Sequence, residues 1–167
     1  MVQDLQYESR IFMDQQKEQP KLGVPSREEM IGYLNEDLAR EYQAIIAYIV
    51  YSQQIKGAAY MDIAKELELH ATEELQHALL ITKQIDYLGG KPVVVPKTVQ
   101  TSDDAVKMLE FDLEAERVTI NHYRDRIRQA ESMGEFAMAE VIRRIIVQEQ
   151  EHAIDLATAL GIEVPRK

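Results

Sequence analysis

The stretch TEELQHALLI, residues 72–81, decides which fold the sequence predicts, because it places charged side chains where a helix core should be apolar. Residues three or four apart share one face of a helix, so one row runs from Leu67 to Ile81. That row passes through Glu74 and His77. A carboxylate on a buried face is costly unless another charge compensates it. The rest of the sequence should therefore contain what neutralises Glu74.

Composition limits the possible classes of protein. The chain has 167 residues, of which 46% are hydrophobic and none is cysteine, as expected for one globular domain with a single core. Its formal net charge of −10 argues against holding nucleic acid by the phosphates and suits a protein that handles cations. Without thiolates, any metal must be held by carboxylate and imidazole groups.

The first 25 residues form a polar, Gln-rich extension. They carry acids where a signal peptide has lysines, and no segment of the chain is apolar for long enough to cross a membrane. They contain three basic and four acidic residues, so they lack the positive charge that a DNA-compacting tail needs. We therefore expect a soluble, cytoplasmic protein that binds neither membrane nor nucleic acid.

Helix start and stop signals divide residues 26–162 into four helices, followed by a short tail over residues 163–167. Ser26 and Glu29 form a capping box that begins the first helix, which should end near Ile55, before Gly57. A second helix is predicted from about Ala59 to Tyr87.

The segment GGKPVVVPKTVQ, which follows the second helix, has no helical period and predicts a long crossover. A third helix should begin at an N-cap on Thr101 or Ser102, with acids in its first turn, and run to about Ser132. The fourth should begin after Gly134 and end at Gly161. Four such helices predict an all-α fold, an antiparallel four-helix bundle with a crossover between helices two and three.

Each predicted helix carries one core row with charge near its middle. The first and third rows each contain a single glutamate, and the second and fourth each contain a Glu-x-x-His pair. Antiparallel packing brings these groups to one level of the core. They are Glu41, Glu74, His77, Glu116, Glu149 and His152. The rows begin and end with apolar residues, from Ile31 through Ile45 to Ile55 in the first helix and from Val106 to Ala130 in the third.

The pattern also repeats along the chain. Glu41 and Glu74 are separated by 33 residues, as are Glu116 and Glu149. Adding 75 to the number of Glu41, Glu74 or His77 gives an identical residue each time, which indicates two related helix pairs with pseudo-twofold symmetry.

Six core ligands in this doubled pattern predict a site for two metal ions. Four carboxylates and two divalent cations nearly cancel in charge, so the cations would neutralise Glu74. Oxygen and imidazole ligands suit iron or manganese, with zinc as a competitor. One Glu-x-x-His pair in a chain with 29 acidic residues is easily accidental, but two pairs matched by two core glutamates are not.

Three further residues on the rows have two interpretations each. Tyr48 and Tyr123 lie two turns after Glu41 and Glu116, and are either core aromatics that hydrogen-bond a ligand or groups that give up an electron. His70 is either a hydrogen-bonded core histidine or group behind the ligands, or a ligand itself. His122 lies off the row, at a predicted helix–helix boundary.

These motifs resemble the ferritin-like superfamily, and the bacterioferritins within it, over about residues 30–160. The similar segments are LAREYQAIIAY, EELQHA, DLEAE and QEQEHAIDL, together with the crossover LGGKPVVVPKTVQTSDDA. The resemblance implies a ferroxidase that oxidises Fe²⁺ with O₂ or H₂O₂ and stores iron in a protein shell.

The resemblance also implies the role of each ligand. One iron would lie on Glu41 and His77, the other on Glu116 and His152. The remaining Glu74 and Glu149 would bridge both, and Tyr48 would match a tyrosine near the iron site.

Two departures from the bacterioferritin pattern change the expected partners. Bacterioferritins hold haem through a methionine immediately after the second-helix glutamate, and Leu75 stands there, so no haem is expected. The segment GIEVPRK follows the fourth helix where bacterioferritins have a fifth, which favours a shell of 12 subunits slightly over one of 24. The competing hypothesis is a diiron oxygenase or a rubrerythrin-like peroxidase that works with a separate partner.

Overall fold

A computed structural model describes residues 23–164, and every structural statement below concerns that part of the chain. The predictions for most of the polar extension, residues 1–22, and for residues 165–167 lie outside it. The elements in chain order are α2 (Arg27–Gln54), the 3₁₀ turn η1 (Ala58–Tyr60), α3 (Met61–Tyr87), α4 (Ala105–Ser132) and α5 (Phe136–Leu160).

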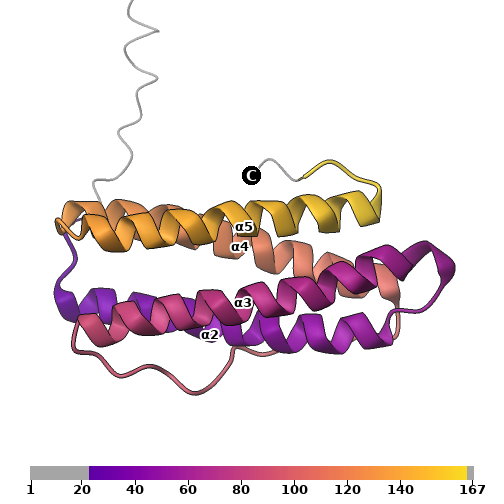
Figure 1. Ribbon diagram of the computed structural model, residues 1–167, viewed down its shortest axis with the longest axis horizontal. Coiled ribbons are helices and arrows are strands. Elements are labelled where there is room, and N and C mark those ends of the chain that lie inside the picture. Colours follow the sequence, from indigo (N-terminus) through magenta and orange to yellow (C-terminus); the bar gives the residue numbers. More distant parts are fainter. Residues whose placement is uncertain (1–22, 165–167) are drawn as a thin grey trace, which may run out of the picture.

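The four long helices form an antiparallel bundle (Figure 1). Within it, α2 packs mainly on α3 and α4 mainly on α5, so the chain forms two helical hairpins. The hairpins meet through the α2–α4 and α3–α5 contacts. The segment from α3 to α4 runs the length of the bundle beside the first hairpin (Figure 1). The predicted fold, including the crossover, is confirmed. No helix in residues 23–164 combines the length and the apolar character needed to cross a membrane.

The predicted signals at the ends of α2 and α3 act as expected. The Glu29 amide donates to Ser26 Oγ at 3.2 Å, and the Ser26 amide donates to Glu29 Oε2 at 2.8 Å, which completes the capping box. α2 ends at Gln54, and Gly57 lies in the turn that follows, as the N-cap of η1, with φ +123°, a conformation that other residues rarely adopt. One turn of 3₁₀ helix precedes α3, which therefore begins at Met61 rather than at Ala59.

The predicted start of the third helix is wrong by two or three residues. Its N-cap is Asp104, whose Oδ1 accepts from the Lys107 amide at 3.0 Å, rather than Thr101 or Ser102. Ser102 instead accepts from the Asp104 amide, and Tyr51 donates its hydroxyl proton to the Gln100 carbonyl. These contacts keep the end of the crossover extended along α2, so the helix cannot begin earlier.

The crossover is attached to α2 by polar contacts along its length. Asn35 donates to the Lys91 carbonyl at 3.1 Å and accepts from the Val93 amide at 2.7 Å. Further along, the Lys97 amide donates to the Ala39 carbonyl at 2.9 Å, and Gln43 donates to the Thr98 carbonyl at 2.7 Å. The crossover therefore lies in one register on α2.

Two apolar clusters fill the bundle, one toward each end. One includes Tyr51, Leu67 and Leu156, and the other includes Leu34, Ile81 and Ile142. Most positions of the predicted rows are buried, including the row ends Ile55 and Ala130. Exceptions are Ile31 and Ile45, which are only partly buried, and Val106, which is 42% exposed, with Met30 and Met108 buried instead.

An ion pair that joins the two hairpins lies inside the bundle. Arg126 of α4 donates to Asp37 of α2 from Nε at 2.6 Å and from Nη2 at 3.3 Å, and it also contacts Gln129. Both charged side chains are 5% exposed or less. Removing one partner of a buried pair leaves an uncompensated charge in the core.

We expect Arg126→Met to lower the free energy of unfolding by about 3–5 kcal/mol, because Asp37 would lose its counter-charge. The measurement is urea unfolding of the metal-free protein. Arg128→Met is the matched control, since Arg128 pairs with Asp125 at an exposed position, where such pairs contribute about 1 kcal/mol or less. An equal effect of the two substitutions would contradict the prediction.

Candidate metal centre

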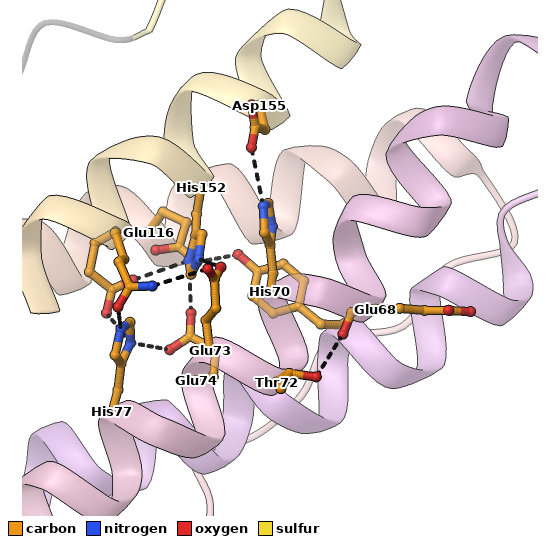
Figure 2. Close-up of polar contacts among 12 residues, drawn as sticks. Glu68, His70, Thr72, Glu73, Glu74, His77, Glu116, His152 and Asp155 are labelled. Atoms are coloured by element: carbon orange, nitrogen blue, oxygen red, sulfur yellow. Dashed lines mark hydrogen bonds and ion pairs between the residues drawn. The ribbon is translucent and has the colours of Figure 1, made fainter.

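The six predicted ligands come together at the middle of the bundle, between the two apolar clusters. Figure 2 shows Glu74, His77, Glu116 and His152 among them. Each long helix contributes at mid-length, where antiparallel packing places all four helices at one level. None of the six side chains belongs to a residue that is more than 3% exposed. This six-residue site consists of Glu41 from α2, Glu74 and His77 from α3, Glu116 from α4, and Glu149 and His152 from α5.

Two four-residue groups within the site could each hold one metal ion, and in each group the candidate ligand atoms all lie within 4.8 Å of one another. The two groups share Glu74 and Glu149. The first group adds Glu41 and His77 to these two residues. The second adds Glu116 and His152.

The shared glutamates each present one oxygen to each histidine. His77 Nδ1 lies 3.0 Å from Glu74 Oε2 and 3.3 Å from Glu149 Oε1. His152 Nδ1 lies 3.0 Å from Glu74 Oε1 and 3.5 Å from Glu149 Oε2. Glu41 completes the first group at 3.4 Å from His77, and Glu116 the second at 3.8 Å from His152. Each shared carboxylate is thus placed to bridge two ions.

Unpaired atoms in the site indicate what it fits. Each of the four glutamates has at least one oxygen that is buried and lacks a hydrogen-bond partner, and both oxygens of Glu149 do. His152 Nδ1 also lacks a partner. Buried acceptors without donors are unfavourable, and cations would satisfy all of them at once. A donor set of carboxylate oxygens and imidazole nitrogens suits iron, manganese or zinc.

The electrostatics of the metal-free site show the same need for positive charge. Burial raises the pKa of Glu74 well above its usual value, and the neighbouring Glu149 and Glu41 raise it further. Burial alone would lower the pKa of His77, but the carboxylates of Glu149, Glu41 and Glu74, which lie 3.0–3.4 Å from its Nδ1, raise that pKa well above the usual value. The pKa of His152 rises for the corresponding reason. Protonated histidines therefore balance the carboxylates, and cations that bound at the site would displace these protons.

Both core tyrosines hydrogen-bond a glutamate that belongs to only one group. Tyr48 donates its hydroxyl proton to Glu116, and Tyr123 donates to Glu41. Burial raises the pKa of both phenols, and the nearby carboxylates add to it, so the hydroxyls remain proton donors. Each tyrosine therefore holds one oxygen of a carboxylate that is not shared between the groups. The interpretation of these tyrosines as electron donors stays a prediction.

The two remaining histidines lie outside both four-residue groups. His70 Nε2 is 3.2 Å from Asp155 Oδ2, and its ring stacks on His152 with the centroids 4.1 Å apart (Figure 2). His122 is partly buried and lies 3.1 Å from Arg40 of α2, at the boundary between α4 and α2. His70 thus supports the ring of a candidate ligand.

Sequence reasoning missed two residues behind the histidines. Glu73 accepts from His152 Nε2 at 2.9 Å, and Gln148 contacts His77 Nε2 at 3.0 Å. In the sequence both look like surface residues, since each is polar and lies one position before a core glutamate, off the core row. Their signal was the 75-residue repeat, because positions 73 and 148 are equivalent.

A pocket of about 350 Å³ leads to the site between α2 and α4. All four glutamates of the site line it, so it is the candidate route from the surface of the bundle to the carboxylates. Arg40 and Glu114 also line it, with Gln100 of the crossover.

Comparisons with known proteins agree with this architecture. The profile of the Ferritin-like domain family matches residues 31–163. A bacterioferritin from Desulfovibrio desulfuricans is 29% identical over 125 residues, which cover 74% of this chain and 70% of that protein. A Bacillus anthracis structure described as ferritin-like and diiron-carboxylate has 32% identity and a TM-score of 0.77, over 80% of this chain and 96% of that one.

A second solved structure has a similar fold. It is a dodecameric thioferritin, described as a bacterioferritin-related protein, from Bacteroides fragilis, with 30% identity and a TM-score of 0.76 over 83% of this chain and 88% of that one. The family match covers most of the residues that form the bundle and includes all six residues of the site. The chain belongs to the ferritin-like domain family, and its relatives include the bacterioferritins.

Proposed function

We propose that the protein is a ferroxidase: it binds two Fe²⁺ ions in the six-residue site, oxidises them with O₂ or H₂O₂, and passes the product to a protein shell. The observation that carries the proposal is the pair of four-residue groups that share Glu74 and Glu149. Two shared carboxylates would hold two ions close together, at about the 3.5–4 Å typical of two-metal sites.

Each residue of the site has a proposed role. Glu41 and His77 hold one Fe²⁺, and Glu116 and His152 hold the other. Tyr48 and Tyr123 donate hydrogen bonds to Glu116 and Glu41, so these two carboxylates are oriented before the ions bind. Manganese or zinc could occupy the same ligands.

The substrates are two Fe²⁺ ions and one oxidant. Each Fe²⁺ gives up one electron, O₂ accepts both electrons with two protons, and hydrogen peroxide leaves. When H₂O₂ is the oxidant, the same two electrons and two protons convert it to two water molecules. The pocket between α2 and α4 supplies a route to the carboxylates for both substrates. Each cation that binds also displaces protons from the histidines.

Anaerobic titration with Fe²⁺ or Co²⁺ tests the ligand set. Saturation at about two ions per chain, followed by ferric absorption when O₂ or H₂O₂ is added to the Fe²⁺ form, is the expected result. Comparing the two oxidants in parallel identifies the preferred one. If ferric absorption required an organic substrate or a separate electron-transfer partner, the oxygenase or peroxidase hypothesis would replace the ferroxidase.

The shell is proposed as a closed homo-oligomer, with 12 subunits slightly preferred over 24. The related Bacteroides fragilis protein is described as dodecameric, which supports the smaller shell. Light scattering at micromolar concentration measures the mass directly. A stable monomer or dimer would leave iron oxidation possible but would remove storage from the proposal.

We expect protein produced with ample haem to contain none. Leu75, which is 48% exposed on α3, has no lone pair to offer a haem iron. The measurement is the Soret absorbance after gel filtration. A stoichiometric band would contradict the prediction. Leu75→Met restores the residue that bacterioferritins have at this position, and weak haem binding could appear in that variant.

A further inference from the structure

A hydrogen-bonded pair of side chains lies behind the histidines, on the side away from the shared carboxylates. His152 Nε2 contacts Glu73 Oε2 at 2.9 Å (Figure 2), and His77 Nε2 contacts Gln148 Oε1 at 3.0 Å. Gln148 Nε2 in turn donates to Glu73 Oε1 at 3.0 Å. One chain of hydrogen bonds therefore joins the outer nitrogens of both rings.

The chemistry of Glu73 fixes the direction of every bond in this chain. An ionised carboxylate only accepts, so His152 must donate from Nε2, and Gln148 must turn its NH₂ group toward Glu73. The oxygen of Gln148 then faces His77, which must also donate from Nε2. In each ring the proton therefore stays on Nε2, and Nδ1 is the nitrogen left for a cation. Through Gln148, one carboxylate orients both histidines.

The two rings nevertheless have different partners. Positions 73 and 148 are equivalent in the 75-residue repeat and each directly precedes a shared glutamate, yet one residue is charged and the other is neutral. A hydrogen bond to a carboxylate is stronger than one to an amide, and it raises the basicity of the opposite ring nitrogen. His152 should therefore be the stronger ligand of the two.

We propose that Glu73 is a positioning residue that makes the two metal positions unequal, so that the ion at Glu116 and His152 binds more tightly than the ion at Glu41 and His77. This inference rests on the proposed two-metal site. Partners behind metal ligands typically change affinity by about 10- to 100-fold. Because the Glu73 side chain is 27% exposed, we expect the lower end, about tenfold. The His152 position then fills first, and the His77 position fills last.

Anaerobic Co²⁺ titration of two variants isolates the positions. His77→Ala leaves the His152 position, and His152→Ala leaves the His77 position. We expect the first variant to bind its ion about tenfold more tightly than the second. The exchange Glu73→Gln/Gln148→Glu keeps the composition and the net charge, and it moves the carboxylate behind His77. In that background the order of the two affinities should reverse.

Glu73→Gln alone provides a second test, because both rings would then be backed by an amide and the two affinities should converge. The inference would be overturned if the two positions bound Co²⁺ equally tightly with Glu73 and Gln148 both unchanged. It would also be overturned if the His152 position stayed the tighter one both in the exchange and in Glu73→Gln. A residue with only a structural role would change the melting temperature of the metal-free protein and could not reverse the order. If the unmodified chain failed to bind two Co²⁺ ions, the proposed function would fail instead.

Discussion

Glu74→Ala/Glu149→Ala should lower the initial rate of iron oxidation by at least about 100-fold. Each substitution removes a carboxylate that faces both histidines, so the double variant loses the only residues common to the two four-residue groups. Even partners behind metal ligands change affinity by about 10- to 100-fold, and directly coordinating residues should matter more. The rate is measured from the ferric absorbance after Fe²⁺ is mixed with O₂.

The matched control is Glu110→Ala/Glu140→Ala, which removes two exposed glutamates from α4 and α5 and changes the net charge equally. Its oxidation rate should stay close to that of the unmodified chain. The oxidation rate of His77→Ala should lie between those of the double variant and the control, because the substitution weakens mainly one metal position and leaves a slow residual oxidation. If the Glu74→Ala/Glu149→Ala variant still bound two ions and oxidised iron at the original rate, the six-residue site would be wrong.

Mn²⁺ or anaerobic Fe²⁺ should raise the melting temperature of the protein by about 10–20 °C. Each ion that binds only the folded state adds about 2.7 kcal/mol at a concentration 100 times its dissociation constant, so two ions add about 5 kcal/mol. For a chain of this size, 1 kcal/mol corresponds to about 2–4 °C. The gain reflects the buried carboxylates that repel one another in the metal-free site. Calorimetry with and without the metal measures it.

The rise in melting temperature should shrink as the pH falls from about 8 to about 6. Burial and the neighbouring Glu149 raise the pKa of Glu116 to about 7 in the metal-free fold. Below that pH the protonated side chain stabilises the metal-free fold, and this contribution is lost as the pH rises through 7. Cations must displace the same protons, so they add less at low pH. If the metal still raised the melting temperature of the Glu74→Ala/Glu149→Ala variant, the metal would bind outside the six-residue site.

Most of the fold could be predicted because each element carries its own local signal. The capping box at Ser26 and the glycines at positions 57, 134 and 161 mark helix ends without reference to the rest of the chain. The start of α4 could not be found in this way. Asp104 is the N-cap because the preceding residues are held on α2, and the sequence around Thr101 contains no sign of that contact.

The six residues of the site could be predicted because charge on a core row is conspicuous and because the pattern occurs twice. The supporting residues lack that contrast. Glu73 and Gln148 are partly exposed and resemble any polar helix surface. Asp37 and Arg126 are 89 positions apart, and their pairing depends on which helix faces which. Such contacts follow from the packing of the two hairpins, and no local pattern encodes them.

The division of the bundle into two hairpins also affects the kinetics of folding. Each hairpin forms from contacts that are close in sequence, so its assembly should be fast, and docking of the two halves should come later. Glu41, Glu74 and His77 belong to one half, and the other three residues of the site to the other. A bound ion then cross-links two preformed halves. It should act mainly by slowing their separation, and so appear as a lower unfolding rate with little change in the refolding rate.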